Sequence, residues 1–189
     1  MKIIEEKIRE AVKKNNRAVI AVDGRCASGK TTFCEYLKGK YNCNIVHMDH
    51  FFLPPEIRTA ERLCEPGGNI HRERLLDEVI SKLGTGKAFS YRPYSCKEKS
   101  FGGEIKLSPD TFTVFEGAYA CHPILGNYYD LSIFFDIDPE KQIERIISRN
   151  GKGEAEVFKS KWILLEEKYF DTFGIKEKCD IVVQSIKNE

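Results

Sequence analysis

Hydrophobic residues follow two spacings along the chain, and segments of the two kinds alternate. Apolar side chains at helical intervals predict helices over residues 2–15, 30–39 and 71–83, another after Pro139, and a last one containing Phe158, Trp162, Leu165 and Tyr169. Short continuous apolar runs predict buried strands over residues 17–23, 44–48, 111–115, 131–137 and 180–183. This alternation is typical of an α/β fold, a three-layer α/β/α arrangement with a mostly parallel central sheet.

Two segments follow neither spacing. Residues 49–70 contain three prolines and several charged clusters, which predicts a long functional loop. Residues 89–108 predict an edge hairpin around Gly102-Gly103, because Pro93 cannot donate to a central strand ladder. The chain shows no internal repeat and no linker-like stretch, so we expect one domain over residues 1–189.

Composition excludes several classes of protein. The 189 residues carry 30 Lys and Arg against 29 Asp and Glu, a net charge of +1 that argues against a dedicated nucleic-acid binder. The apolar runs are too short to predict a membrane span. The N-terminal segment is amphipathic and carries acidic residues, which is unlike a secretory signal. Seven cysteines without a CxxC pair predict reduced thiols in a cytoplasmic protein. The apolar face of the first helix could pack on the sheet or on a second copy, so a homo-oligomer stays open.

A phosphate-binding motif lies between the first predicted strand and the second helix. Residues 24–31 read GRCASGKT and match GxxxxGK(S/T), the loop that cradles the phosphates of a nucleoside triphosphate. Glycines let successive N–H groups turn toward a phosphate, and the helix N-terminus adds partial positive charge. We expect Lys30 to reach the β- and γ-phosphates and the Thr31 hydroxyl to ligate Mg²⁺. The expected ATP-binding residues are Gly24, Arg25, Cys26, Ala27, Ser28, Gly29, Lys30, Thr31 and Thr32.

Acidic residues end two further strands. Asp49 follows NIVHM, and Glu116 ends TVFE. In a parallel sheet the carboxyl ends of the strands border the ligand crevice. We therefore expect Asp49 to accept the proton of an attacking hydroxyl, and Glu116 to hold Mg²⁺ directly or through water. The alternatives are a helix cap for Asp49 and a turn residue for Glu116.

Basic and aromatic residues add to the candidate site. Arg145 and Arg149 are four residues apart on one helical face, and we expect them on a lid near residues 145–161 that meets the charge of the transferred phosphoryl group. The expected hairpin carries side chains that can stack on a base or hydrogen-bond to its edge, namely Tyr91, Arg92 and Tyr94. A solvated basic face and an ordinary edge hairpin are the alternatives.

The phosphate-binding motif does not say what is done with the nucleotide. A GTPase needs an NKxD-type guanine reader, which is absent, and the chain is too short for the signature segments of transporter or motor ATPases. An acid after the second strand, an acceptor-side hairpin and a basic lid favour a small-molecule kinase. A nucleotide-binding switch remains an alternative. So does a kinase of a phosphate-bearing acceptor, to which Arg58, Arg62 and Arg92 could supply charge.

The motifs VDGRCASGKTT, MDHFFLP, GNIHRERLLDEV, YRPYSC, FEGAYACHP and DIDPEKQIERIISRNG resemble, in this order, those of the uridine kinase-like family of P-loop nucleoside kinases, and the likeness covers nearly the whole chain. The resemblance implies a P-loop NTPase fold, ATP and Mg²⁺, and phosphorylation of the ribose 5′-hydroxyl of a nucleoside. It implies Asp49 as the catalytic base and Glu116 as the magnesium-associated acid. It also implies Tyr91 beside the nucleobase, and Arg145 and Arg149 as lid arginines.

Two histidines depart from that family pattern. His71 stands where members carry an aspartate that holds the ribose hydroxyls, and a neutral imidazole offers one acceptor nitrogen there. His50 stands where a second acid is expected after Asp49. We therefore keep His71 as a candidate substrate-binding residue and leave the acceptor open among a nucleoside, pantothenate, a sugar phosphate and a nucleotide.

Overall fold

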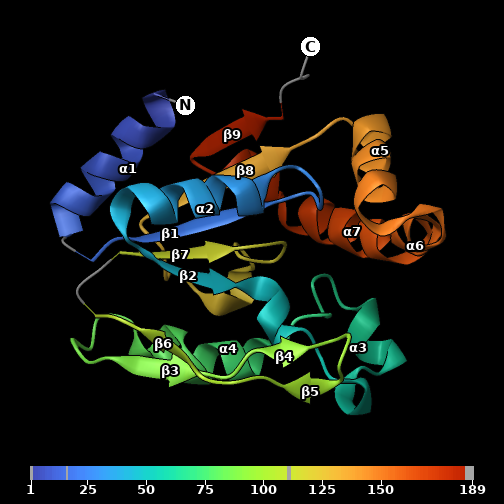
Figure 1. Cartoon of the computed structure of the whole chain (residues 1–189), viewed down its shortest axis with the longest axis horizontal. Coiled ribbons are helices and arrows are strands. Elements are labelled where there is room, and N and C mark those ends of the chain that lie inside the picture. The colour runs from blue at the N-terminus through green and yellow to red at the C-terminus, as the bar shows by residue number, and fades with distance from the viewer. Residues whose placement is uncertain (1, 16, 110–111, 186–189) are drawn as a thin grey trace.

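The computed structural model describes residues 2–15, 17–109 and 112–185. At its centre lies a five-stranded parallel sheet in the order β2-β7-β1-β8-β9 (Figure 1). Its strands are β1 (Val19–Gly24), β2 (Asn44–His47), β7 (Thr113–Glu116), β8 (Leu131–Asp136) and β9 (Ile181–Gln184). The expected α/β fold and parallel sheet are confirmed, while Thr111, placed in a strand by the sequence pattern, lies outside the described residues.

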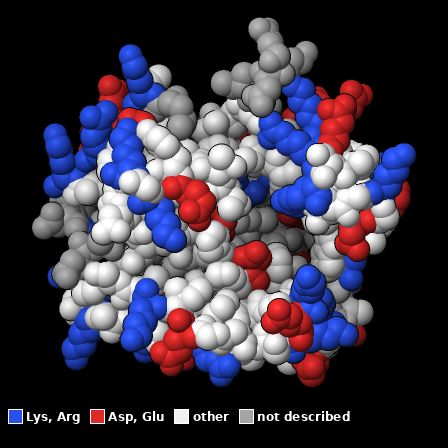
Figure 2. Space-filling model, in the orientation of Figure 1, with Lys and Arg blue, Asp and Glu red and all other residues white. Residues whose placement is uncertain are grey.

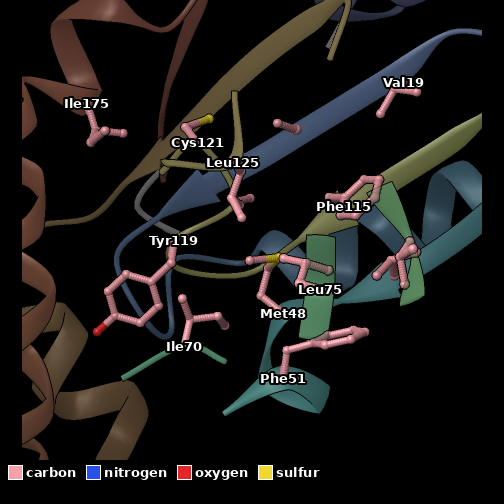
Figure 3. Packing of buried hydrophobic residues seen from close by; sticks show 14 of the residues in the cluster. Val19, Met48, Phe51, Ile70, Leu75, Phe115, Tyr119, Cys121, Leu125 and Ile175 are labelled. Carbon is pink, nitrogen blue, oxygen red and sulfur yellow. The ribbon is translucent and has the colours of Figure 1, made fainter. Parts of the chain in front are cut away.

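Both faces of the sheet are buried, which is why its strands read as continuous apolar runs. Alternate residues of β1 face opposite sides: Ile20 and Val22 belong to one apolar cluster, and Ala21 belongs to the other. The first face is covered by α1 (Lys2–Asn15) and α2 (Lys30–Tyr41). The second face, whose packing Figure 3 shows, is covered by α4 (Arg72–Glu78), α7 (Ile163–Phe173) and α8 (Ile175–Lys178).

Helices continue from the end of β8 to α7. Asp138 caps α5 (Pro139–Asn150) by accepting hydrogen bonds from the N–H groups of Glu140 and Lys141, at 3.0 and 3.2 Å. A single residue, Gly151, separates α5 from the next helix, and its φ of 86° turns the chain directly into that helix. The segments that follow are α6 (Lys152–Val157) and a π-helical turn (Phe158–Trp162), which runs without interruption into α7.

The segment after β2 is more regular than its prolines suggest. The expected loop over residues 49–70 contains three short helices, η1 (Met48–Phe51), η2 (Pro55–Ile57) and α3 (Ala60–Cys64). The helix expected over residues 71–83 is also different, because it ends early. Val79 leaves helical geometry while staying fully buried, so α4 is followed by a separate short helix, η3 (Ile80–Lys82).

The sequence correctly predicts antiparallel pairing over residues 89–108, but the prediction of a turn at Gly102-Gly103 is wrong. Four short strands form two antiparallel pairs, β3 (Phe89–Tyr91) with β6 (Ile105–Leu107) and β4 (Tyr94–Ser95) with β5 (Ser100–Phe101). The turn of the inner pair is therefore at residues 96–99. Gly102 does not turn there because its N–H donates to the carbonyl of Pro93 at 2.8 Å. These strands and α4 lie below the main sheet in Figure 1.

Candidate functional site

The loop after β1 is built for close backbone approach. Gly24 has a φ of 127°, and a Cβ at this position would collide with the backbone of Phe135 on β8. Ala27 and Gly29 also have positive φ, at 59° and 103°. The three residues give the loop its turns and lead into the N-terminus of α2, where the first N–H groups of a helix have no intrahelical partner. Residues 24–31 thus form the anion-binding geometry that the motif predicts.

A cavity of about 850 Å³ opens beside this loop. It is lined by residues 27–33, together with Arg145 and Arg149 of α5. The hydroxyl oxygen of Ser28 is buried in the loop and has no hydrogen-bond partner among the described residues. The Lys30 ammonium donates to the carbonyls of Gly24 and Arg25, both at 2.8 Å. A phosphate in the cavity would meet one cation of the loop and a hydroxyl group that lacks a partner, so the residues fit a polyphosphate.

Two oxygen ligands suited to Mg²⁺ meet at the edge of the sheet. The Thr31 hydroxyl donates to Oε1 of Glu116 at 3.1 Å, which brings the two predicted metal-binding residues together. Burial would raise the pKa of Glu116, but the hydrogen bond from His47, the charge of Lys30 and the Thr31 contact outweigh it and lower that pKa. No group of three or more His, Cys, Asp or Glu side chains suited to a metal occurs among the described residues. This donor set fits Mg²⁺, which binds through one or two protein oxygens plus phosphates and waters.

A chain of polar contacts runs from Glu116 toward the acceptor side. Nδ1 of His47 lies 2.8 Å from Oε2 of Glu116, and this hydrogen bond is the main reason why the pKa of His47 is raised. The His47 ring packs edge-on against the ring of His50, with 5.2 Å between centroids. Nδ1 of His50 is in turn 3.0 Å from the Tyr91 hydroxyl, and burial lowers the pKa of His50. The metal-side and acceptor-side residues are therefore neighbours.

Asp49 lies on η1, directly after β2, with an exposed side chain. Within the described part of the chain its carboxylate forms no hydrogen bond and no ion pair. Its charge does contribute, after burial, to the raised pKa of Tyr91, which places the carboxylate near that phenol. An exposed carboxylate without a partner, beside a buried aromatic residue, is free to accept a proton from a ligand.

A second cavity, of about 320 Å³, is lined by Glu78, Ser90, Tyr91, Arg92, Phe101 and Glu104. Two of the residues expected to contact a substrate, Tyr91 and Arg92, are thus in its wall. Tyr94 is not among these lining residues, because its ring is buried against Phe101 at 5.4 Å between centroids. The cavity carries both signs of charge, and Figure 2 shows acidic and basic residues mixed over the hollowed face of the molecule.

His71 and the arginines of this region have structural partners. His71 is the N-cap of α4, and its Nδ1 accepts the N–H of Arg74 at 3.3 Å. Arg92 donates through Nε to the carbonyl of Gly102 at 2.9 Å. Arg62 and Arg58 likewise donate to backbone carbonyls, of Gly68 and Leu53 respectively. These guanidinium groups hold loops in place.

The two arginines of α5 differ in their contacts. Nη1 of Arg145 donates to the carbonyl of Ala27 in the phosphate loop at 3.1 Å and to the hydroxyl of Ser185 at 2.9 Å. Arg149 is exposed, and its Nε donates to the side chain of Asn150 at 2.7 Å. Both line the large cavity. Arg145 therefore already contacts the loop, whereas Arg149 can reach into the cavity from the surface.

Three acids were not found by sequence reasoning, two of them buried (Asp23 and Glu166) and one half-buried (Glu167). Asp23 is fully buried and accepts four hydrogen bonds, from the N–H groups of Gly24, Tyr119 and Cys121 and from the Tyr169 hydroxyl. Burial nevertheless raises its pKa overall. The one signal in the sequence was a charged residue inside an otherwise apolar strand, VIAVDG.

The other two acids lie on α7 and hold the phosphate loop. Glu166 accepts the N–H of Cys26 at 3.0 Å, and burial raises the pKa of this carboxyl group. Glu167 forms a bidentate ion pair with Arg25, with N–O distances of 2.6 and 2.7 Å, and Arg25 also pairs with Asp136. Arg25 and Cys26, both expected to bind ATP, thus anchor the loop to its surroundings.

Comparison with known proteins supports the fold. No protein-family model and no curated protein sequence matches the chain. Among solved structures it is similar to a possible uridine kinase from Bacillus stearothermophilus, with a TM-score of 0.63, 18% identity, and coverage of 93% of this chain and 98% of that one. D-glycerate 3-kinase from Cryptococcus neoformans var. grubii gives a TM-score of 0.56 at 15% identity, with coverage of 89% and 86%. Shikimate kinase from Bacteroides thetaiotaomicron gives a TM-score of 0.51 at 16% identity, with coverage of 91% of this chain and 89% of that one.

These similarities confirm the P-loop NTPase fold that the resemblance implied. They do so at identities at which the fold alone is shared. No helix within the described residues is long and apolar enough to cross a membrane.

Proposed function

We propose that this protein is an ATP-dependent kinase that transfers the γ-phosphoryl group to a hydroxyl of a small molecule, with the ribose 5′-hydroxyl of a nucleoside as the acceptor. The observation that carries the proposal is the contact between Thr31 and Glu116, 3.1 Å long, at the mouth of the phosphate loop. It puts a hydroxyl and a carboxylate together where the metal of a bound nucleotide is held. Three proteins of similar fold, one of them a possible uridine kinase, are also named as kinases.

Different residues act on the phosphate donor and on the acceptor hydroxyl. The 24–32 loop binds the phosphates, and Lys30 leaves its carbonyl partners to follow the charge of the transferred group. Thr31 and Glu116 would hold Mg²⁺, which neutralises charge on the phosphate oxygens when it is bound. Asp49 accepts the proton of the acceptor hydroxyl. Arg145 and Arg149 cover the transferred group and exclude water.

The acceptor side favours an uncharged hydroxyl compound. A phosphate-bearing acceptor requires free cations, but Arg58, Arg62 and Arg92 already donate to backbone carbonyls. The second cavity also contains Glu78 and Glu104, whose charges would repel a phosphate. A nucleoside carries hydroxyls and a stackable base without such a charge, and Phe101 and Tyr91 offer aromatic surface for it.

The test is coupled ADP release with ATP and Mg²⁺, scanned over nucleosides, pantothenate, sugar phosphates and nucleoside monophosphates. We expect stimulation by a nucleoside and a loss of at least about 10²-fold in Asp49→Asn, since general-base catalysis contributes about 10²–10⁴-fold. ATP affinity, measured separately by calorimetry, should stay within about twofold. Asp77→Asn makes the same chemical change at an exposed position of α4 and is the matched control.

Two results would count against the proposal. Tight ATP binding without stimulation by any acceptor would favour the nucleotide-binding switch. Equal losses of turnover and ATP affinity in Asp49→Asn would remove the role assigned to Asp49.

A further inference from the structure

We infer that His47 is a positioning residue for the metal site: its Nδ1–H fixes the carboxylate of Glu116 so that Thr31 can offer its oxygen to Mg²⁺. The inference rests on the proposed function, because it concerns the nucleotide-bound metal of the same site. His47 falls within the strand that the sequence predicts over residues 44–48.

The two oxygens of Glu116 have different partners. Oε1 accepts the Thr31 hydroxyl at 3.1 Å, and Oε2 lies 2.8 Å from Nδ1 of His47. The last torsion of a Glu side chain is soft, so one contact alone would leave the carboxylate free to rotate. Two contacts on opposite oxygens hold it in one orientation. The Glu116 side chain is only 8% exposed, so water has little access to replace either partner.

The orientation of Glu116 decides what Thr31 can do. A hydroxyl has one hydrogen to donate and two lone pairs. While the hydrogen is directed at Oε1 of Glu116, the lone pairs of Thr31 face away from the carboxylate and are available to a cation. If Glu116 turns, the Thr31 hydroxyl loses its acceptor and its lone pairs lose their direction. His47 thus acts on the metal through two other residues.

His47 is itself held in place from both sides. It is the residue of β2 directly paired with Glu116 of β7 in the sheet register, so the backbone fixes the distance between the two side chains. The His50 ring packs edge-on against it, at 5.2 Å between centroids. The donor at Nδ1 is present in the imidazolium and in one neutral tautomer, so the contact does not require a charged ring.

The test measures metal binding without turnover. Mn²⁺ replaces Mg²⁺, and electron paramagnetic resonance reports free Mn²⁺ during titration of the full chain saturated with ATP. Calorimetry in EDTA gives the ATP affinity without metal. His47→Leu removes the donor at similar volume, while His47→Asn keeps an amide donor near the position of Nδ1. His122→Asn is the matched control, because His122 contacts the carbonyl of Pro66 and neither His47 nor Glu116.

We expect His47→Leu to weaken Mn²⁺ binding about tenfold, the lower range for losing a partner of a metal ligand, with ATP affinity in EDTA unchanged. His47→Asn should stay within about threefold of the wild type and His122→Asn within about twofold. If His47→Leu does not fold, His47→Gln takes its place, since its longer amide cannot put a donor at the same point.

Three results would overturn the inference. Mn²⁺ affinity in His47→Leu could match the wild type, or His47→Asn could be as weak as His47→Leu. ATP affinity in EDTA could fall as much as Mn²⁺ affinity, which would mean a general structural role. A wild-type chain that binds no ATP would instead overturn the proposed function, and with it the role of His47.

Discussion

Removing the Tyr169 hydroxyl tests the buried hydrogen bonds that Asp23 accepts next to the phosphate loop. This hydroxyl donates to Oδ2 of Asp23 at 2.8 Å, and both residues are fully buried. Tyr169→Phe removes one oxygen and leaves the ring in place. The three remaining donors to Asp23 are backbone N–H groups, which cannot move to replace it. We expect the carboxylate to lose one charge-assisted hydrogen bond without compensation.

The size of the loss follows from the charge of the acceptor. A hydrogen bond to a charged group contributes about 1.5–3 kcal/mol to stability, so we expect Tyr169→Phe to lower the free energy of unfolding by about 2 kcal/mol. For a chain of this length that corresponds to a decrease of about 4–8 °C in Tm. Tyr128→Phe is the matched control, because the Tyr128 hydroxyl donates to a neutral acceptor, the carbonyl of Ala120, at 2.6 Å. Tyr128→Phe should lower the free energy of unfolding by about 1 kcal/mol.

Urea denaturation at pH 8, followed by circular dichroism, measures both variants. The slope of the free energy against urea should be unchanged, so that the midpoint alone reports the stability change. A loss below about 0.5 kcal/mol in Tyr169→Phe, or one no larger than in Tyr128→Phe, would refute the reasoning that Asp23 depends on a charge-assisted bond.

Three further predictions concern the surroundings of the site. Burial would raise the pKa of Asp136, but two paired cations outweigh it and lower that pKa, so its stabilisation is present above the unfolded pKa and lost as pH falls through the folded one. Asp136→Asn should therefore flatten the decline of unfolding free energy between about pH 5 and pH 2, and equal slopes in urea melts would contradict this. Gly117→Ala should lower the free energy of unfolding by about 1–3 kcal/mol in the same melts, because Gly117 has a φ of 135° and a Cβ there would lie 2.9 Å from the Cβ of Met48. An unchanged urea midpoint would show that neither the backbone angle nor the close contact affects stability. Arg145→Ala should lower acceptor-stimulated turnover about 10²-fold, and a change in ATP affinity alone, measured by calorimetry, would argue against a contact with the transferred group.

Much of the fold could be predicted because the sheet is buried on both faces. Runs such as VIAVDG and LSIFFD are then nearly continuous, and their alternation with helical segments is visible in the sequence. The hairpin over residues 89–108 was harder to predict. Gly102-Gly103 has the composition of a turn, but pairing of Gly102 with the carbonyl of Pro93 moves the turn to residues 96–99. Such a register depends on contacts between residues that carry no periodic signal.

Some contacts of the candidate site could likewise be predicted from the sequence, and others could not. The meeting of Thr31 with Glu116 could be expected, because Thr31 follows β1 and Glu116 ends β7, and the carboxyl ends of these strands share one edge of the sheet. The contact between Glu166 and the N–H of Cys26 could not, because the two residues are 140 positions apart. Helical spacing shows which face of a helix is apolar, but not which loop a carboxylate on another face will meet.

One helix supports both sides of the proposed reaction. Four consecutive residues of α7 contact the phosphate loop, its preceding strand and the end of α3, namely Glu166, Glu167, Lys168 and Tyr169. Lys168 makes the acceptor-side contact, donating to the carbonyl of Cys64 at 2.7 Å. Because α6, the π-helical turn and α7 are continuous, we expect a movement of the lid predicted near residues 145–161 to bend the helix at the π-helical turn or to shift α7. A shift of α7 would also move its contact with Cys64, so that the phosphate loop and the segment over residues 49–70 would depend on one supporting helix.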